Sequence, residues 1–133
     1  MSMKLRLDFM ARITHFDMAA DHPTELFPFY EKVFGWKFEK WSGGFDYWFI
    51  KTGPESEPGI DGGLGRREGD DPTGTVNVID VDDIDTALRD LAAAGGTVIR
   101  PKGPIPGVGW FALFSDPQGL SFGLMQADES VGT

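Results

Sequence analysis

The second half of this chain matches the first half when one is displaced by 61 positions along the other. The matched positions share their chemical character or their size class. They pair Asp21 with Asp82, Gly35 with Gly96, Leu26 with Ala87, Tyr30 with Leu91, and Phe38 with Ile99. A repeated unit of this kind buries its apolar face against an equivalent unit. The repeat therefore predicts an α+β fold made of two βαβββ modules.

The first module opens with an alternating segment, residues 12–18, which predicts a strand with His15 and Asp17 on one side. Asp21 and the proline two positions later are typical of a helix start. Pro28 lies inside the expected helix, and an interior proline costs about 3 kcal/mol. We therefore expect a distorted first turn or a later start of the regular helix. Three further strands are predicted at residues 36–41, 45–51 and 59–65.

The second module repeats this order. A strand is predicted at residues 75–81, and Asp82 or Asp83 is expected to cap the helix that follows. The segment 101–109 is rich in proline and glycine, which predicts a loop. The remaining strands are expected at residues 97–100, 110–114 and 120–126, with a turn at 116–119 before the last of them.

The chain length of 133 residues suits one domain and is short for two. We assign this domain to residues 10–127. The predicted divisions are module 1 at about 10–66, a linker at 67–73, module 2 at about 74–127, and tails at 1–9 and 128–133. The first nine residues lack the long apolar stretch and the cleavage site of a signal peptide.

Charge and cysteine content exclude several classes of function. The formal net charge of −9 repels polyanions, so nucleic acid is not an expected partner. The absence of cysteine excludes disulfides and thiolate metal sites, and it fits a cytoplasmic protein. No apolar run approaches the roughly 20 residues of a membrane span, so no membrane partner is expected.

Five segments together resemble the vicinal oxygen chelate superfamily, which includes glyoxalase I, extradiol dioxygenases and bleomycin-resistance proteins. These segments are ITHFDMAADHP, FYEKVFGWKF, GIDGGL, VDDIDTALRDLAAAGGTVI and DPQGLSFGLMQ. The resemblance extends over almost the whole chain, from about residue 11 to residue 126. It implies that the two modules form a cup-like, curved mixed sheet, and that the protein is a homodimer.

Enzymes of this superfamily usually hold a divalent metal with four side chains on strands that line the cup. The corresponding positions here resemble His15, Gly62, Val76 and Gly123. Only His15 has a side chain that can bind a metal, whereas a catalytic zinc site typically needs about three protein ligands. Asp17 and Asp80 lie two or more residues away along their strands. We therefore expect no cofactor, with a divalent metal as the alternative.

His15 is the candidate catalytic residue, because an imidazole titrates near neutral pH. The alternative is a hydrogen-bonded histidine with a structural role. Asp17 is a candidate ligand-binding residue, but residues two apart on a strand are separated by about 6.6 Å, which predicts no direct contact with His15. Tyr47, Trp110 and Met125 are candidate ligand-lining residues, and their alternative is a place in the core.

These features favour a protein that binds a small apolar, aromatic or carbonyl-containing molecule in the cup without a metal. The alternative is a metal-dependent lyase, isomerase or dioxygenase of the same superfamily that uses His15. A third hypothesis is an interaction module. The sequence leaves open whether the protein is an enzyme.

Overall fold

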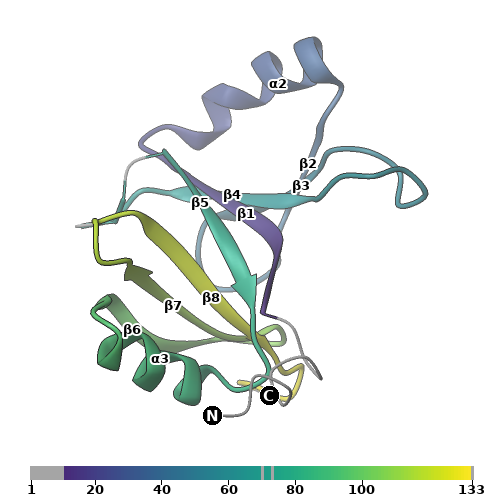
Figure 1. Cartoon of the computed structure of the whole chain (residues 1–133). Coiled ribbons are helices and arrows are strands. Elements are labelled where there is room, and N and C mark those ends of the chain that lie inside the picture. The colour runs from purple at the N-terminus through teal and green to yellow at the C-terminus, as the bar shows by residue number, and fades with distance from the viewer. Residues whose placement is uncertain (1–10, 70, 73, 133) are drawn as a thin grey trace. The chain divides into compact units, whose positions relative to one another are not determined.

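The computed structural model describes residues 11–69, 71–72 and 74–132. The expected N-terminal tail at 1–9 lies outside the described residues. The described elements follow the order β1 (Arg12–Ala20), η1 (Pro23–Leu26), α2 (Phe27–Phe34), β2 (Lys37–Lys40), β3 (Tyr47–Lys51), β4 (Gly62–Arg66), β5 (Gly74–Asp80), α3 (Ile84–Ala93), β6 (Thr97–Ile105), β7 (Gly109–Ser115) and β8 (Ser121–Ala127) (Figure 1). Among these residues, no helix is long and apolar enough to cross a membrane.

The chain divides into two compact units, each described here by itself. The N-terminal unit is Thr14–Asn77, and the C-terminal unit consists mainly of Val78–Thr133. Within the N-terminal unit the strand order is β2-β3-β4-β1, with β1 parallel to β4 and the other pairs antiparallel. In the C-terminal unit β8, β7 and β6 are antiparallel neighbours. The predicted α+β class and the repeated βαβββ order are confirmed.

The helix of the N-terminal unit starts late, as Pro28 predicts. A 3-10 turn, Pro23–Leu26, precedes regular α2, and Pro28 lies in the first turn of α2, where its missing N–H costs nothing. The expectation that Asp21 caps this helix is wrong. His22 occupies the N-cap position without a side-chain bond, and the Glu25 amide donates to the His22 carbonyl instead. A backbone carbonyl at the start of the 3-10 turn thus provides the acceptor that a capping side chain would otherwise provide.

Alternation along β3 assigns side chains to the two faces of the N-terminal unit's sheet. Trp48 and Ile50 are buried, and Phe27 of α2 packs edge-on against Trp48 with ring centroids 5.5 Å apart. Leu64 of β4 pairs with Trp48 and lies on the same face. Tyr47 and Phe49 therefore point away from α2. Tyr47 and Trp48 face opposite sides, as predicted.

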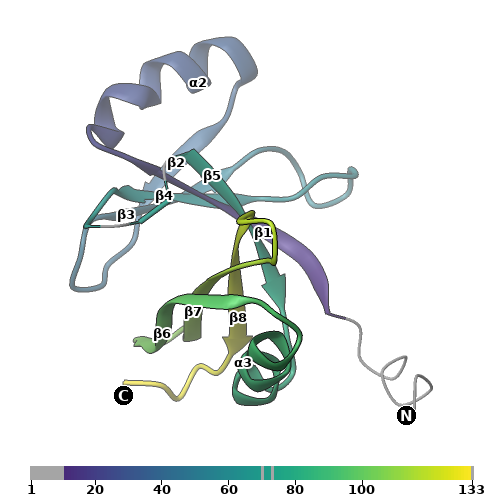
Figure 2. The same cartoon turned by 60° about the vertical axis from the view of Figure 1, so that its left-hand side comes forward.

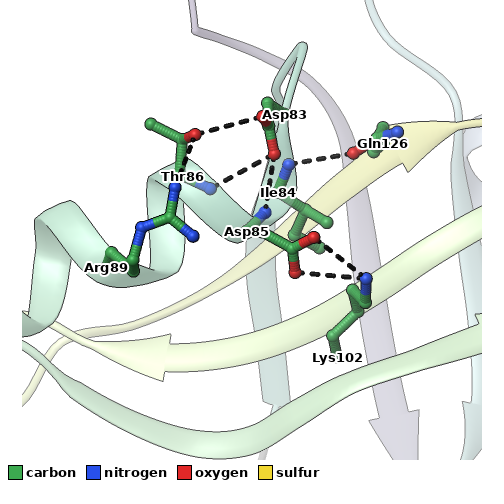
Figure 3. Close-up of polar contacts among 7 residues, drawn as sticks. All are labelled: Asp83, Ile84, Asp85, Thr86, Arg89, Lys102 and Gln126. Carbon is green, nitrogen blue, oxygen red and sulfur yellow. Dashed lines mark hydrogen bonds and ion pairs between the residues drawn. The ribbon is translucent and has the colours of Figure 1, made fainter.

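The helix of the C-terminal unit is capped as the sequence predicts. The Asp83 carboxylate accepts hydrogen bonds from the amides of Asp85 and Thr86, at 3.1 and 3.2 Å (Figure 3). The Ile84 amide donates to Oε1 of Gln126, which ties the start of α3 to β8. A core of Ile84, Ala112 and Leu124 lies beneath the helix. Figure 2 gives a second view of α3 beside these strands.

Replacing Asp83 by alanine is expected to lower the Tm of the protein by a few degrees at pH 7, because two amides at the start of α3 lose their acceptor. Hydrogen bonds from Thr86 hold the pKa of Asp83 below its ordinary value. The contribution is therefore complete above the unfolded pKa of about 3.9 and is lost as the pH falls through the folded pKa. Thermal unfolding by circular dichroism at pH 7 and at pH 2 measures both effects.

Asp82→Ala is the matched control for this experiment, because the neighbouring Asp82 is not the capping residue. We expect Asp82→Ala to leave the Tm nearly unchanged at both pH values. Equal losses of Tm in the two variants would contradict the assignment of the cap to Asp83.

Two predictions near the C-terminus are wrong. The loop expected at 101–109 is strand up to Ile105, with register shifts between Val98 and Gly103 where β6 pairs with β7. β6 stands at the end of the strand order, and prolines are tolerated on such an edge because one side of the strand donates no ladder bonds. The tail expected after residue 127 is not loose: Val131 is buried, and its carbonyl accepts from the Gly107 amide at 2.8 Å.

Candidate functional site

Three polar side chains meet on the face of the N-terminal unit's sheet that points away from α2. The Tyr47 hydroxyl donates to Oδ1 of Asp17 at 2.7 Å. Nε2 of His15 lies 3.1 Å from the same Asp17 oxygen and 3.3 Å from the Tyr47 hydroxyl. We call these residues the His15–Asp17–Tyr47 cluster. β1 contributes the first two residues, and β3 contributes the third, which reaches across β4.

The predicted separation of His15 and Asp17 is therefore wrong. Their backbones are two residues apart on β1, but both side chains are long enough to lean together across the intervening distance. The contact also assigns the histidine hydrogens. A carboxylate has only acceptor sites, so Nε2 of His15 carries the donated hydrogen. The cluster thus directs two donors onto one carboxylate oxygen.

Two polar atoms of the cluster make no hydrogen bond to any residue that the structure describes. They are Oδ2 of Asp17 and Nδ1 of His15, because both contacts to Asp17 use Oδ1 and both contacts of His15 use Nε2. The side chains of His15 and Asp17 are 30% and 22% exposed. Both side chains of the pair are therefore only partly covered by the rest of the protein.

Tyr47 is held as a neutral phenol. Burial raises the pKa of Tyr47 far above its ordinary value of about 10, and the charge of Asp17 and the hydrogen bond to it raise this pKa further. The phenol therefore acts as a hydrogen-bond donor at neutral pH. It fixes the Asp17 carboxylate in place.

A glycine of β4 makes room for Tyr47. A Cβ atom built on Gly63 would overlap the Tyr47 hydroxyl and would lie 2.7 Å from Oδ1 of Asp17. At Gly65 the same construction gives an ordinary contact, 3.6 Å from the Tyr47 ring. Tyr47 thus lies over β4 and fills the volume that a side chain at position 63 needs. The resemblance had pointed to the neighbouring Gly62 as the position of this strand that faces the cup.

The assignment of Gly62 to the same side of the sheet as His15 is wrong. Gly62 pairs with Phe16, and a Cβ on Gly62 would lie 2.6 Å from the Phe16 ring, which contacts Trp36 on the α2 side. The position on β4 that faces the cluster is Gly63, which pairs with Asp17. The residue of β4 that faces the cluster is thus one position later than the 61-residue offset predicts. Because Gly62 and Gly63 are identical, the sequence does not show this difference.

Aromatic side chains pack against Tyr47 of the cluster. Phe49 lies 5.8 Å from Tyr47 between ring centroids, and Phe45 lies 6.4 Å from it, both in edge-to-face contact. Trp41 packs against Phe45 at 4.7 Å. Phe49 and Phe45 are 41% and 51% exposed, so they offer apolar surface beside the polar atoms. Phe49 was not among the predicted lining residues, although the alternation of β3 assigns it to the same face as Tyr47.

The other predicted site residues lie elsewhere. Trp110 packs against the Ile84 core on the α3 side, and Nζ of Lys102 lies 4.5 Å from the centroid of its ring. Of the two places predicted for Trp110, the structure shows the core and not the ligand-lining face. Met125 pairs with Phe111 and points away from α3. Val76 is a buried apolar residue. Gly123 is closely packed, because a Cβ there would lie 3.0 Å from the Phe111 ring.

The donor set at His15 does not fit the divalent metal that the resemblance implies. Among the described residues, no group of three or more histidine, cysteine, aspartate or glutamate side chains could hold a metal ion. His15 and Asp17 are bonded to each other, and the raised pKa of Tyr47 keeps its oxygen protonated and a poor ligand. Two side chains fall short of the usual three-ligand catalytic site.

Solved structures share the fold of this chain. A hypothetical protein from Bacillus halodurans C-125 matches with a TM-score of 0.67 and 16% identity, over 94% of this chain and all of that one. A methylmalonyl-CoA epimerase, crystallised with methylmalonyl-CoA and NH4+, matches with a TM-score of 0.65 and 18% identity, over 92% of this chain and 99% of that one. At such identities the likeness shows the fold alone.

Sequence comparisons give the family. The putative glyoxylase CFP32 of Mycobacterium bovis is 50% identical over 46 residues, and the match spans 35% of this chain and only 18% of that relative. The same values hold for CFP32 of Mycobacterium tuberculosis. A family profile matches residues 12–124, which is most of the chain. The chain belongs to the Glyoxalase/Bleomycin resistance protein/Dioxygenase superfamily.

Proposed function

We propose that this chain binds a small apolar, aromatic or carbonyl-containing molecule on the face that carries the His15–Asp17–Tyr47 cluster, without a metal. The observation that carries the proposal is the association of half-exposed aromatic rings with a few convergent polar groups. Small-molecule sites typically have this composition. The donor set argues against a metal, because Asp17 is already the acceptor of both neighbouring donors.

A thermal-shift screen tests this proposal. Ligands that bind the folded state are expected to raise the Tm by the same amount in EDTA as in zinc, nickel or manganese, because stabilisation follows RT ln(1 + [L]/Kd). The Tyr47→Phe variant should lose most of this ligand-dependent rise, since Asp17 loses one of the two donors that fix it. Ligand effects that require a metal would contradict the proposal, as would a fully occupied metal at His15 in soaked crystals.

The contact between His15 and Asp17 favours a second candidate, an enzyme of the lyase, isomerase or dioxygenase type with His15 as its base. A carboxylate that accepts from Nε2 orients the imidazole and leaves Nδ1 free to take a proton. For an identified substrate, His15→Ala would then reduce turnover by about 10²–10⁴-fold. The exposed histidine His22 supplies the control, His22→Ala. Unchanged turnover in His15→Ala would exclude His15 as the base.

The proposal also covers the oligomeric state of the protein and its location in the cell. Exposed Phe29, Val33 and Phe34 on α2 favour a homodimer, and the absence of cysteine favours the cytoplasm. Light scattering coupled to size-exclusion chromatography measures the oligomeric state. A single monomeric mass at micromolar concentration would exclude the dimer.

A further inference from the structure

The hydrogen bonds inside the cluster leave it with acceptors and without free donors. The Tyr47 hydroxyl and Nε2 of His15 both give their hydrogens to Oδ1 of Asp17. The atoms that remain for a ligand are Oδ2 of Asp17 and, on neutral His15, Nδ1. Both accept hydrogen bonds. A ligand that complements this site therefore supplies N–H or O–H groups.

The charges near Asp17 favour a cation over an anion. Among the described residues, His15 is the one basic side chain that pairs with Asp17. Lys51 lies on the same face by alternation of β3, but its Nζ is 3.6 Å from Oδ2 of Asp61. The chain as a whole has a net charge of −9, which repels anions and attracts cations. A carboxylate ligand at Asp17 would meet like charge.

The rings that contact Tyr47 suit the apolar part of such a ligand, and one of them, Phe49, pairs with Gly63 across β4 from Asp17. Phe49 and Phe45 both contact Tyr47 and are about half exposed. The face of an aromatic ring attracts a cation within about 6 Å, and it also covers apolar groups. A carboxylate acceptor next to exposed rings is complementary to an ammonium group attached to an apolar body.

We infer that the His15–Asp17–Tyr47 cluster binds a small organic amine in its protonated form. An N–H group of the amine donates to Oδ2 of Asp17, and the apolar part of the molecule lies against Phe49. This inference rests on the proposed small-molecule site and narrows its ligand class. Carbonyl and carboxylate ligands are disfavoured, because the donors they need are already engaged with Asp17.

Three probes that share a phenyl ring test the inference: benzylamine, benzyl alcohol and benzoate. Each is titrated at pH 7 into uniformly 15N-labelled full-length protein, and affinities are taken from amide shifts of Gly63 and its neighbours. Benzylamine is expected to bind about tenfold more tightly than benzyl alcohol, because a charge-assisted hydrogen bond is roughly twice as strong as a neutral one. Benzoate is expected to bind most weakly.

The Asp17→Asn variant keeps the shape of the side chain and removes its charge. It should lower the affinity for benzylamine about tenfold, to that of benzyl alcohol, and leave benzyl alcohol nearly unchanged. Asp21→Asn is the control, since it removes one negative charge from an exposed residue of the same unit. It should leave all three affinities unchanged. If Asp17→Asn does not fold, the ranking of the three probes on the unmodified protein decides.

The outcomes separate the two proposals. Equal affinity for the three probes, with amide shifts at Gly63, would contradict the proposal of amine binding but would agree with the proposed small-molecule site. Tighter binding of benzoate would do the same. No amide shift at this face with any of the probes at millimolar concentration would overturn both.

Discussion

Replacing Gly63 by alanine is expected to break the His15–Asp17–Tyr47 cluster and to lower the free energy of unfolding by about 1–3 kcal/mol. The new methyl group would overlap the Tyr47 hydroxyl and crowd Oδ1 of Asp17. Tyr47 is a rigid ring with its base on β3, so its hydroxyl cannot move away without giving up the 2.7 Å bond to Asp17. A largely buried hydroxyl then lacks its partner, which is costly in itself.

Urea unfolding followed by tryptophan fluorescence measures the loss of stability, and the amide titration with benzylamine measures the loss of binding. Gly65→Ala is the control, because its methyl group meets the Tyr47 ring at an ordinary distance of 3.6 Å. We expect it to change stability by less than about 1 kcal/mol and to keep binding. Equal behaviour of the two variants would show that the placement of Tyr47 over Gly63 is wrong.

Replacing Leu64 by alanine is expected to lower the free energy of unfolding by about 2–5 kcal/mol, because it removes a fully buried side chain and leaves a cavity. Leu64 is 0% exposed and pairs with Met18 and Trp48 on the face that points toward α2. Its effect on the cluster should be small, since the side chain lies on the opposite face from Tyr47. Urea unfolding measures the change in the free energy of unfolding. The effect on the cluster is measured separately, by benzylamine titration without urea, where most molecules remain folded.

Leu120→Ala is the matched control for this cavity. Leu120 is among the exposed apolar residues, so the same truncation should cost less than about 0.5 kcal/mol. Retained benzylamine affinity in folded Leu64→Ala, together with lost affinity in Gly63→Ala, would assign the two neighbouring residues to different faces. A Leu64→Ala variant as stable as the unmodified protein would contradict the burial of this side chain.

The repeat predicted the elements well because each one carries its own signal. The helix Ile84–Ala93 has a capping aspartate, an apolar face and glycines after its end. Tyr47 and Trp48 follow strand alternation, so their opposite faces could be predicted. Proline content misled the prediction at 101–105, because it weakens a strand only where both sides must donate ladder bonds.

The face of β4 could not be predicted in the same way. Side-chain direction in a strand alternates with a period of two, so a displacement of one residue reverses it. Gly62 and Gly63 are adjacent and identical, and the apolar pattern gives no information about which of them faces His15. The register became clear only through pairing with Phe16 and Asp17 on β1.

The cluster itself depends on contacts that sequence spacing does not contain. Strand geometry gives the distance between the backbones of His15 and Asp17, but the rotamers that join their side chains depend on the third partner. Tyr47 is 30 residues from Asp17 along the chain and reaches it across β4. No local pattern connects these positions, although each residue alone could be selected as polar and cup-facing.

The Tyr47 ring occupies the space above β4 that a side chain at position 63 would need. A descendant of this chain can keep a large ring on β3, or it can acquire a side chain on β4, but one substitution at a time leads through a crowded or a hollow intermediate. We therefore expect related chains that keep this strand geometry to carry glycine at position 63 whenever a large ring stands at position 47, because the two side chains would occupy the same space.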